Sequence, residues 1–158
     1  MIEIIKGDLL KSNCKYIAHQ CNCITTNSAG TALAIFTKYP YSNIYQNRYA
    51  YKDMPGTVKI SGNGKDERYI INMFAQWYPG KPKPPRDSVE RRLIWFEDCL
   101  KDIEKISDLD SIGFPYKIGC NLGGGKWEDY FQKLKNFSER INARVIVYDK
   151  QNRQMGLM

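Results

Sequence analysis

Apolar and polar residues recur along this chain with two different periods. Short apolar runs bounded by turn-forming or charged residues predict six strands, at 2–6, 16–18, 57–60, 68–73, 111–114 and 144–148. Apolar residues spaced three or four positions apart predict three helices between these runs, at 31–39, 88–103 and 126–142. Strands and helices that alternate in this way predict a three-layer α/β/α domain around a mixed central sheet.

The chain length of 158 residues suits a single domain, which we expect to span 1–148. The last residues, 149–158, follow no periodic pattern, and we expect them to form a mobile C-terminal tail. A loop at 77–86 contains four of the seven prolines, but it is too short to link two domains.

The stretch SIGFPYKIGCNLGGGKW, at 111–127, joins a predicted strand to a predicted helix through three consecutive glycines. A strand, a glycine-rich loop and a helix start in this order aim backbone N–H groups at an anion. Glycine also leaves no Cβ between the main chain and a phosphate group. A glycine-rich loop is by itself a weak signal, and a flexible turn is the alternative interpretation.

A second loop of small and polar residues, at 24–30, lies between the predicted strand at 16–18 and the helix that follows. Asp8 and Asn22 also follow predicted strands. In open α/β sheets, ligands bind beyond the carboxyl ends of the strands, where such loops converge. These positions therefore predict one cleft that binds a nucleotide diphosphate.

Four features of the chain, taken in order, resemble the macrodomain, the α/β fold that binds ADP-ribose. They are Gly7-Asp8 after the first strand, the HQCNC run at 19–23, the PYKIGC run at 115–120 with its glycines, and the closing strand at 145–148. The resemblance covers nearly the whole of the predicted domain. The branch that the chain resembles most is that of the small stand-alone macrodomains similar to ADP-ribose 1″-phosphate phosphatases, which are common in bacteria and viruses.

The resemblance implies roles for individual residues. Asp8 would recognise the adenine amino group and Tyr148 would pack near adenine; a turn-capping role for Asp8 and a core role for Tyr148 are the alternatives. Asn22 and His19 are the candidate catalytic residues. Asn22 would orient the distal ribose, and His19 would either act as a general acid or base or be a core residue. The other residues predicted to bind the ligand are Leu9, Ser28, Ala29, Gly30, Thr31, Gln76, Pro115, Ile118, Gly119, Cys120, Asn121, Leu122, Gly123, Gly124 and Gly125.

The chain departs from the macrodomain pattern at three places. Many relatives have a Gly-x-Gly pair where this chain has 28–30, Ser-Ala-Gly, which affects the loop near the terminal ribose. The branch that removes ADP-ribose from glutamate has a catalytic lysine where this chain has Gln76 and a catalytic aspartate where it has Gly123. An amide cannot replace a nucleophilic lysine, so these departures argue against a lysine-dependent glutamyl hydrolase.

Composition limits the other classes of function. The net charge of +7 favours an anionic ligand, but the basic residues are scattered, so nucleic acid is the less favoured partner. Five cysteines without a C-x-x-C pair and a single histidine give no support to a metal site, and no cofactor is expected. No apolar run approaches the ~20 residues that cross a bilayer. The N-terminus does not resemble a signal peptide, so we expect the cytoplasm, or the host cytoplasm for a viral protein.

The leading hypothesis is an ADP-ribose-recognising hydrolase that acts on ADP-ribose 1″-phosphate or a related 1″-modified ADP-ribose, as a monomer. The first alternative is a module that binds ADP-ribose, or a cyclic derivative of it, without turnover. The second alternative is a hydrolase that removes ADP-ribose from modified proteins. A basic RNA-associated domain is a further class, and it predicts a steep salt dependence of RNA affinity.

Overall fold

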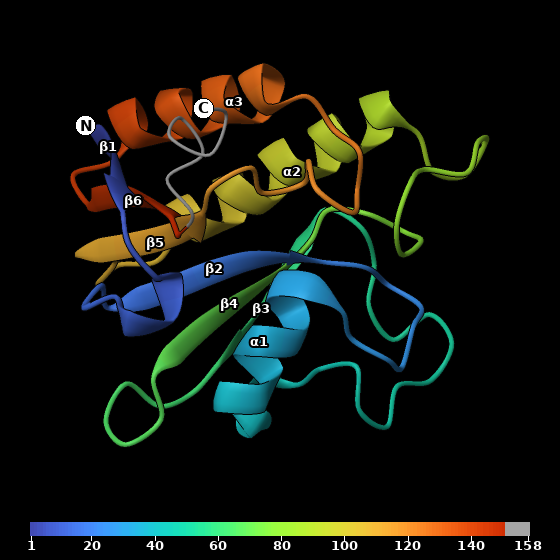
Figure 1. The fold of residues 1–158 in the computed structure, drawn as a ribbon, viewed down its shortest axis with the longest axis horizontal. Coiled ribbons are helices and arrows are strands. Elements are labelled where there is room, and N and C mark those ends of the chain that lie inside the picture. The colour runs from blue at the N-terminus through green and yellow to red at the C-terminus, as the bar shows by residue number, and fades with distance from the viewer. Residues whose placement is uncertain (151–158) are drawn as a thin grey trace.

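The computed structural model describes residues 1–150, which form six strands and three α-helices (Figure 1). The strands are β1 (Ile2–Lys6), β2 (Tyr16–Cys21), β3 (Thr57–Ser61), β4 (Tyr69–Phe74), β5 (Ser111–Pro115) and β6 (Arg144–Asp149). The α-helices are α1 (Gly30–Lys38), α2 (Val89–Glu104) and α3 (Trp127–Arg140), and two short 3-10 helices are η1 (Leu9–Lys11) and η2 (Pro40–Ser42). Every strand and helix predicted from the sequence is therefore present, with small differences at the ends.

Two differences at strand ends affect the site. β2 continues through His19 to Cys21, because each residue from Tyr16 to Cys21 pairs with a residue of β4. The prediction ended this strand at residue 18. β6 includes Asp149, which pairs with Lys6 of β1, so the strand extends into the segment predicted as a tail. Residues 151–158 of that predicted tail lie outside the described residues.

The six strands form one mixed sheet in the order β1-β6-β5-β2-β4-β3. All neighbouring strands are parallel except β3, which pairs antiparallel with β4. The hairpin between these two strands turns at Gly62 and Gly64, whose φ angles are +99° and +77°. A mixed central sheet is the arrangement that the sequence predicted.

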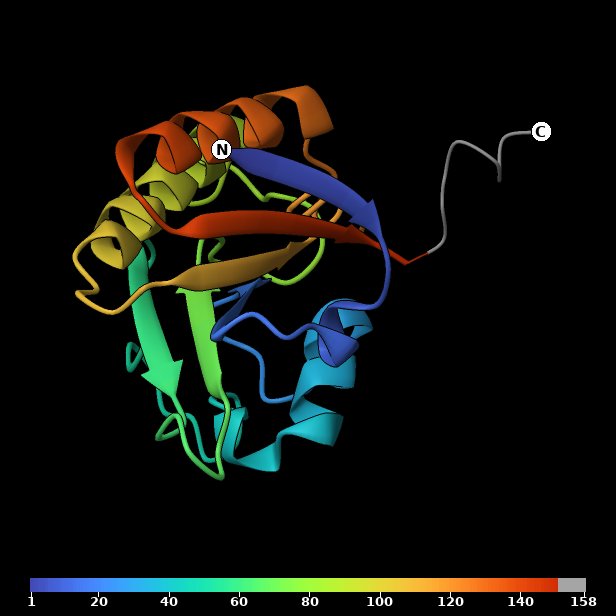
Figure 2. The same cartoon turned by 90° about the vertical axis from the view of Figure 1, so that its left-hand side faces the viewer.

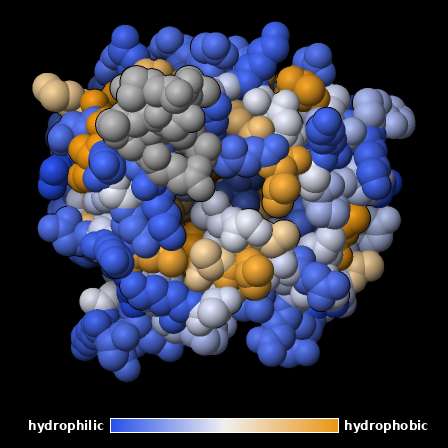
Figure 3. All heavy atoms as spheres, viewed as in Figure 1, coloured by the Kyte–Doolittle hydropathy of each residue, from blue (hydrophilic) through white to orange (hydrophobic). Residues whose placement is uncertain are grey.

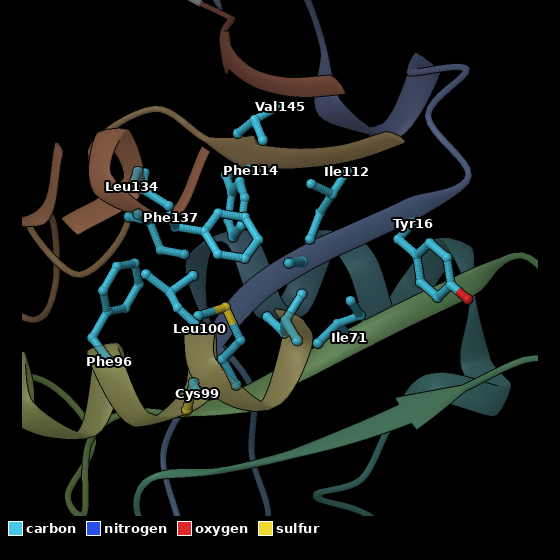
Figure 4. Close-up of a cluster of buried hydrophobic side chains, with 14 of the residues drawn as sticks. Tyr16, Ile71, Phe96, Cys99, Leu100, Ile112, Phe114, Leu134, Phe137 and Val145 are labelled. Carbon is cyan, nitrogen blue, oxygen red and sulfur yellow. The ribbon is translucent and has the colours of Figure 1, made fainter. Parts of the chain in front are cut away.

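Helices cover both faces of this sheet and complete three layers (Figure 2). α2 and α3 lie on one face and α1 lies on the other. Figure 4 shows the core beneath α2 and α3, where Phe96 and Leu100 point toward Leu134, Phe137 and Phe114 of β5. Burying large apolar side chains of this kind contributes about 1.5–3 kcal/mol each. Within residues 1–150, no helix has the length and apolar character needed to cross a membrane.

The sheet opens between its two central strands. β2 pairs with β5 only at its first two residues, Tyr16 with Ile112 and Ile17 with Gly113. After β2 the chain continues through α1 toward β4 and β3, whereas after β5 it continues through α3 to β6 on the other side. The connections therefore diverge between these two strands, which is where open α/β sheets bind ligands.

Candidate functional site

Two adjoining clefts lie at the carboxyl ends of the strands, each with a volume of about 200 Å³. A hollow is visible near the centre of the face seen in Figure 3. One of them has Asp8 on its wall, and we call it the carboxylate cleft. The wall of the other is formed mostly by two loops, and we call it the loop cleft. The clefts share the residues Thr31, Pro115, Tyr116 and Asn121. They therefore form one continuous site.

Tyr148 forms a fixed wall of the carboxylate cleft. Its side chain is buried, and Ser12 Oγ donates a hydrogen bond to Tyr148 Oη at 2.7 Å. A Cβ at Gly113 would lie 3.0 Å from the tyrosine ring, so the absence of a side chain at Gly113 lets the ring pack closely against β5. Burial raises the pKa of Tyr148, which keeps its phenol neutral. An aromatic ring held in this way offers a flat apolar surface to a nucleobase.

Asp8 provides a carboxylate at the other side of this cleft. Its Oδ1 accepts a hydrogen bond from the backbone N–H of Leu10 at 3.0 Å and caps η1. Its Oδ2 lies 3.7 Å from Lys150 Nζ at the surface. The capping interaction thus uses one oxygen, and among the described residues the other pairs only with an exposed lysine that a ligand donor can replace. The turn-capping role and the recognition role of Asp8 are compatible.

Unpaired backbone donors gather in the loop cleft. Within residues 1–150, the N–H groups of Gly119, Asn121, Leu122 and Gly123 donate no hydrogen bond, and all four residues line this cleft. Backbone N–H groups that share one concave surface form an anion-binding site.

The first turn of α1 adds donors to the same cleft. Ala29 is the N-cap of this helix, and its side chain offers no acceptor to the first N–H groups. Ala29, Gly30 and Thr31 line the cleft. The positive end of the helix dipole therefore faces the same space as the glycine-rich loop.

The glycines of this loop are required by close packing rather than by flexibility. Gly119 has a φ of +79°, and a Cβ on it would lie 2.5 Å from the ring of Tyr130 on α3. A Cβ on Gly123 would lie 2.7 Å from the carbonyl oxygen of Gly119. The N–H of Gly125 donates to that same oxygen at 3.1 Å, so the loop curls back on itself.

Three residues predicted to bind the ligand do not line either cleft: Ser28, Gly124 and Gly125. Gly124 faces the side chain of Lys81, and a Cβ on Gly124 would lie 3.4 Å from Lys81 Cγ. Gly125 packs against Tyr130. The last two glycines therefore shape the loop from behind, whereas all the other predicted ligand-binding residues line one of the clefts.

Comparisons with known proteins place this geometry among solved folds. No protein-family model matches the chain. The chain is similar to an ADP-ribose 1″-phosphate phosphatase of Candida albicans, with 28% identity over 92% of this chain and all of the relative. A crystal structure of a Bacteroides thetaiotaomicron protein is 30% identical and has a TM-score of 0.76, covering 94% of this chain and 99% of that one.

Two further solved structures carry the name of the fold. The macrodomain of Mycobacterium tuberculosis DarG is 21% identical with a TM-score of 0.74, over 96% of this chain and 99% of that one. A Trypanosoma brucei macrodomain in complex with ADP-ribose is 13% identical with a TM-score of 0.66, over 98% of this chain and 66% of that one. The chain has the macrodomain fold. The resemblance drawn from four short sequence features is thereby confirmed.

Asn22 lies in the loop cleft of this macrodomain at the end of β2, but most of its amide is already used. Its Oδ1 accepts hydrogen bonds from the N–H groups of Ile24 and Thr25, at 3.0 and 2.9 Å, and from Arg48 Nη1 at 3.3 Å. Its Nδ2 donates to Thr25 Oγ1 at 3.0 Å. One Nδ2 hydrogen remains. Asn22 can therefore meet a ligand only as a donor.

His19 contributes to the floor of the loop cleft, but its side chain is fully buried. One ring nitrogen, Nε2, lies 2.7 Å from Asn72 Oδ1, and the ring meets Phe36 edge-on. Burial lowers the pKa of His19 to about 4, so the imidazole is neutral near pH 7. The burial and these contacts favour the core role over general acid–base catalysis. The sequence left both roles open, because it did not show that β2 continues through this residue.

Gln76 also lines the loop cleft, and its amide is held at both ends. Its Oε1 accepts from Gln20 Nε2 at 2.9 Å, and its Nε2 donates to the carbonyl of Tyr78 at 2.8 Å. An amide fixed in this way cannot act as a nucleophile.

The sequence did not identify several lining residues of the macrodomain. Tyr116 and Lys117 lie within the run at 115–120 and could have been found from it, and Lys117 adopts a φ of +60°. Lys150 lies in the segment predicted as a tail and carried no signal. The remaining residues of this kind are Leu10, Gln20, Asn27, Ala32, Ala34, Ile35, Tyr45, Pro79 and Gly80.

The chemistry available in the loop cleft is that of fixed donors. Lys117 is the one Lys, Arg, Asp or Glu of the described residues that lines it. Burial raises the pKa of the Cys120 thiol to about 12, so that this thiol is neutral. Within residues 1–150, no group of three or more His, Cys, Asp or Glu side chains could hold a metal ion. The cleft can therefore bind and orient an anion, with one cation beside it.

Proposed function

We propose that this macrodomain recognises ADP-ribose and hydrolyses ADP-ribose 1″-phosphate or a related 1″-modified ADP-ribose. The observation that carries the proposal is the continuity of the two clefts. One cleft has a carboxylate and a buried tyrosine, and the other has a wall of unpaired N–H groups. A ligand that fits both has an amine-bearing base at one end and a negatively charged group next to it.

The residues suit the parts of ADP-ribose in order. Asp8 Oδ2 would accept from the adenine amino group, and the ring of Tyr148 would contact the base. The N–H groups of the 119–123 loop and of the first turn of α1 would hold the diphosphate. The phosphatase name of the Candida albicans relative and the ADP-ribose bound to the Trypanosoma brucei macrodomain support this assignment.

Hydrolysis in this site would depend on orientation and electrostatics. Asn22 would donate its remaining Nδ2 hydrogen to a hydroxyl of the distal ribose, since its carbonyl oxygen is already occupied. Those N–H groups of the cleft that do not hold the diphosphate would stabilise the charge on the departing phosphate as water attacks C1″ and the C1″–O bond breaks. Misplacing the reacting ribose by even ~1 Å can slow such a reaction by about 100-fold.

A module that binds ADP-ribose without turnover is the second candidate. The observation in its favour is that the two lining side chains best suited to acid–base work are neutral, because burial lowers the pKa of His19 to about 4 and raises the pKa of Cys120 to about 12. General acid–base groups usually titrate near the working pH.

Two measurements on the pure protein test the proposal. Isothermal titration with ADP-ribose is expected to give saturable binding at one site, with adenosine alone binding more weakly. Incubation with ADP-ribose 1″-phosphate is expected to release inorganic phosphate above the uncatalysed background. Binding without release would favour the module, and the absence of ADP-ribose binding would contradict both candidates.

A further inference from the structure

A buried arginine–aspartate pair lies behind the loop cleft. Arg92 of α2 and Asp87, just before that helix, have side chains that are 2% and 0% exposed. Arg92 Nε donates to Asp87 Oδ1 at 2.8 Å, and Arg92 Nη2 donates to Asp87 Oδ2 at 2.7 Å. The two side chains thus form a bidentate pair in the interior.

The remaining donors of Arg92 go to backbone carbonyls of two separate segments. Arg92 Nη1 donates to the carbonyl oxygens of Gly80, at 2.7 Å, and Gly123, at 3.3 Å. Arg92 Nη2 donates to the carbonyl of Tyr78 at 3.2 Å. A guanidinium has five N–H donors, so every donor of Arg92 has a partner.

Asp87 continues the same network into the loop that follows β4. Its Oδ2 accepts from the backbone N–H groups of Trp77, at 3.2 Å, and Tyr78, at 3.0 Å. Gly80 and Gly123 both line the loop cleft. The pair therefore joins two segments of the cleft wall that are more than forty positions apart in the chain.

The segment that carries Asn22 is held by a second pair of the same kind. Arg48, whose side chain is 2% exposed, pairs with Asp53 at 2.9 Å. Its other donors reach the carbonyls of Asn22 and Thr25, each at 3.0 Å. Both arginines therefore donate hydrogen bonds to backbone carbonyls in the cleft wall and directly beside it, rather than to solvent.

Net stability does not explain such a pair, because buried ion pairs can often be replaced by apolar residues without loss of stability. An apolar pair in the same place could not make the five directed hydrogen bonds that Arg92 donates to Asp87 and to the backbone carbonyls. We propose that Arg92 is a positioning residue that sets the spacing between the 78–80 segment and Gly123. It thereby sets the affinity of the loop cleft for the phosphoribosyl end of the ligand. The identity of that ligand rests on the proposed function.

The experiment compares two ligands on one variant. Arg92→Lys keeps the charge and most of the stem, but an ammonium has three donors and no planar fork. AMP would occupy mainly the carboxylate cleft, whereas ADP-ribose needs both clefts. We expect Arg92→Lys to weaken ADP-ribose binding by about 10–100-fold, since hydrogen bonds to a charged group are lost, while AMP binding changes by less than about twofold. Arg91→Lys, on the exposed side of the same helix turn, is the matched control and should change neither affinity.

Each outcome decides between the explanations. Equal losses for AMP and ADP-ribose, at a temperature where thermal melting shows the variant folded, would mean a general structural role and overturn the proposal. Unchanged ADP-ribose affinity would overturn it as well. If Arg92→Lys does not fold, Asp87→Asn gives the same comparison, because it keeps the shape of the side chain and one acceptor oxygen.

A failure of the proposed function is recognised separately, since wild-type protein would then bind no ADP-ribose. Hydrogen exchange tests the positioning without any ligand. In Arg92→Lys, the hydrogen-bonded amides of Tyr78, Cys120 and Gly125 should exchange at least about tenfold faster than in the wild type, while amides of β4 and β5 keep their rates. Unchanged exchange in both loop segments would refute the positioning role.

Discussion

Replacing Gly123 by alanine is the most direct test of the loop cleft. The residue needs no left-handed backbone, because its φ is not positive, so the substitution adds only a methyl group. That methyl group would lie 2.7 Å from the carbonyl oxygen of Gly119 and 3.3 Å from Arg92 Nη1. Both neighbours are held: the Gly119 oxygen accepts from Gly125 N–H, and Arg92 is buried.

The size of the effect follows from these distances. The methyl group is about 0.7 Å short of the 3.4 Å at which ordinary contacts begin, so the loop must open by roughly that amount. Overpacking of this kind typically destabilises a fold by about 1–3 kcal/mol. The same movement displaces the N–H groups of 121–123 from the anion. Loss of alignment for one or two such donors corresponds to about a 10–100-fold weaker ADP-ribose affinity.

The assay is a calorimetric titration of ADP-ribose into wild type, Gly123→Ala and the control Gly124→Ala. Gly124 has a φ of +75°, so alanine there is strained by about 1 kcal/mol, but its methyl group would meet only the flexible side chain of Lys81. The control should therefore lose a similar amount of stability in urea unfolding and less than about threefold in affinity.

Two results would refute this reasoning. If Gly123→Ala binds ADP-ribose as well as the wild type does, the N–H groups of this loop do not hold the ligand. If Gly124→Ala loses as much affinity as Gly123→Ala, stability rather than donor alignment sets the affinity.

Three further predictions follow from the site. Asp8→Ala should weaken ADP-ribose binding by about 1.5–3 kcal/mol in calorimetry, because a charged hydrogen bond is lost. Asp8→Asn keeps an oxygen that accepts from the Leu10 N–H, so its loss of affinity measures the effect of the charge while the helix cap remains. The pKa of His19 falls from 6.5 unfolded to about 4 folded, so the unfolded chain takes up a proton first as the pH drops. Wild type should lose up to about 3 kcal/mol between pH 6.5 and 4 that His19→Gln does not lose in urea titrations at each pH. A protein with ADP-ribose on glutamate should be a poor substrate in a release assay, because Gln76 cannot attack the ribose.

Periodicity was sufficient to predict the elements of this fold, because each element buries one face. In the helix predicted at 31–39, Ala32, Ile35 and Phe36 lie on one side of α1 and are buried. The position of the clefts also followed, because loops after parallel strands meet at one edge of a sheet. Asp8 and the run at 115–120 could be placed there from the sequence alone.

The residues behind the clefts could not be predicted in this way. Arg92 sits beside Arg91 in the sequence and looks like a second surface charge, but its burial depends on carbonyl groups of Gly80 and Gly123 that are distant in the chain. Similarly, Gly119 and Gly124 look alike in a glycine-rich loop. Only the position of Tyr130 on the following helix makes a side chain at Gly119 clash.

The polar groups of the loop cleft suggest how hydrolysis could proceed without a titrating side chain. His19 is neutral and buried, the Cys120 thiol is neutral, and the carbonyl of Asn22 already accepts several hydrogen bonds. A phosphate leaving from the 1″ position already carries negative charge, so its departure needs stabilisation more than it needs a proton. A leaving group that must be protonated, such as an alkoxide or an amide nitrogen, would also need a proton donor, and among residues 1–150 the one cationic side chain that lines this cleft is Lys117. If the proposed hydrolysis occurs, this donor-rich wall suits a leaving group that departs as an anion, such as a phosphate or a carboxylate, better than an alkoxide or an amide nitrogen.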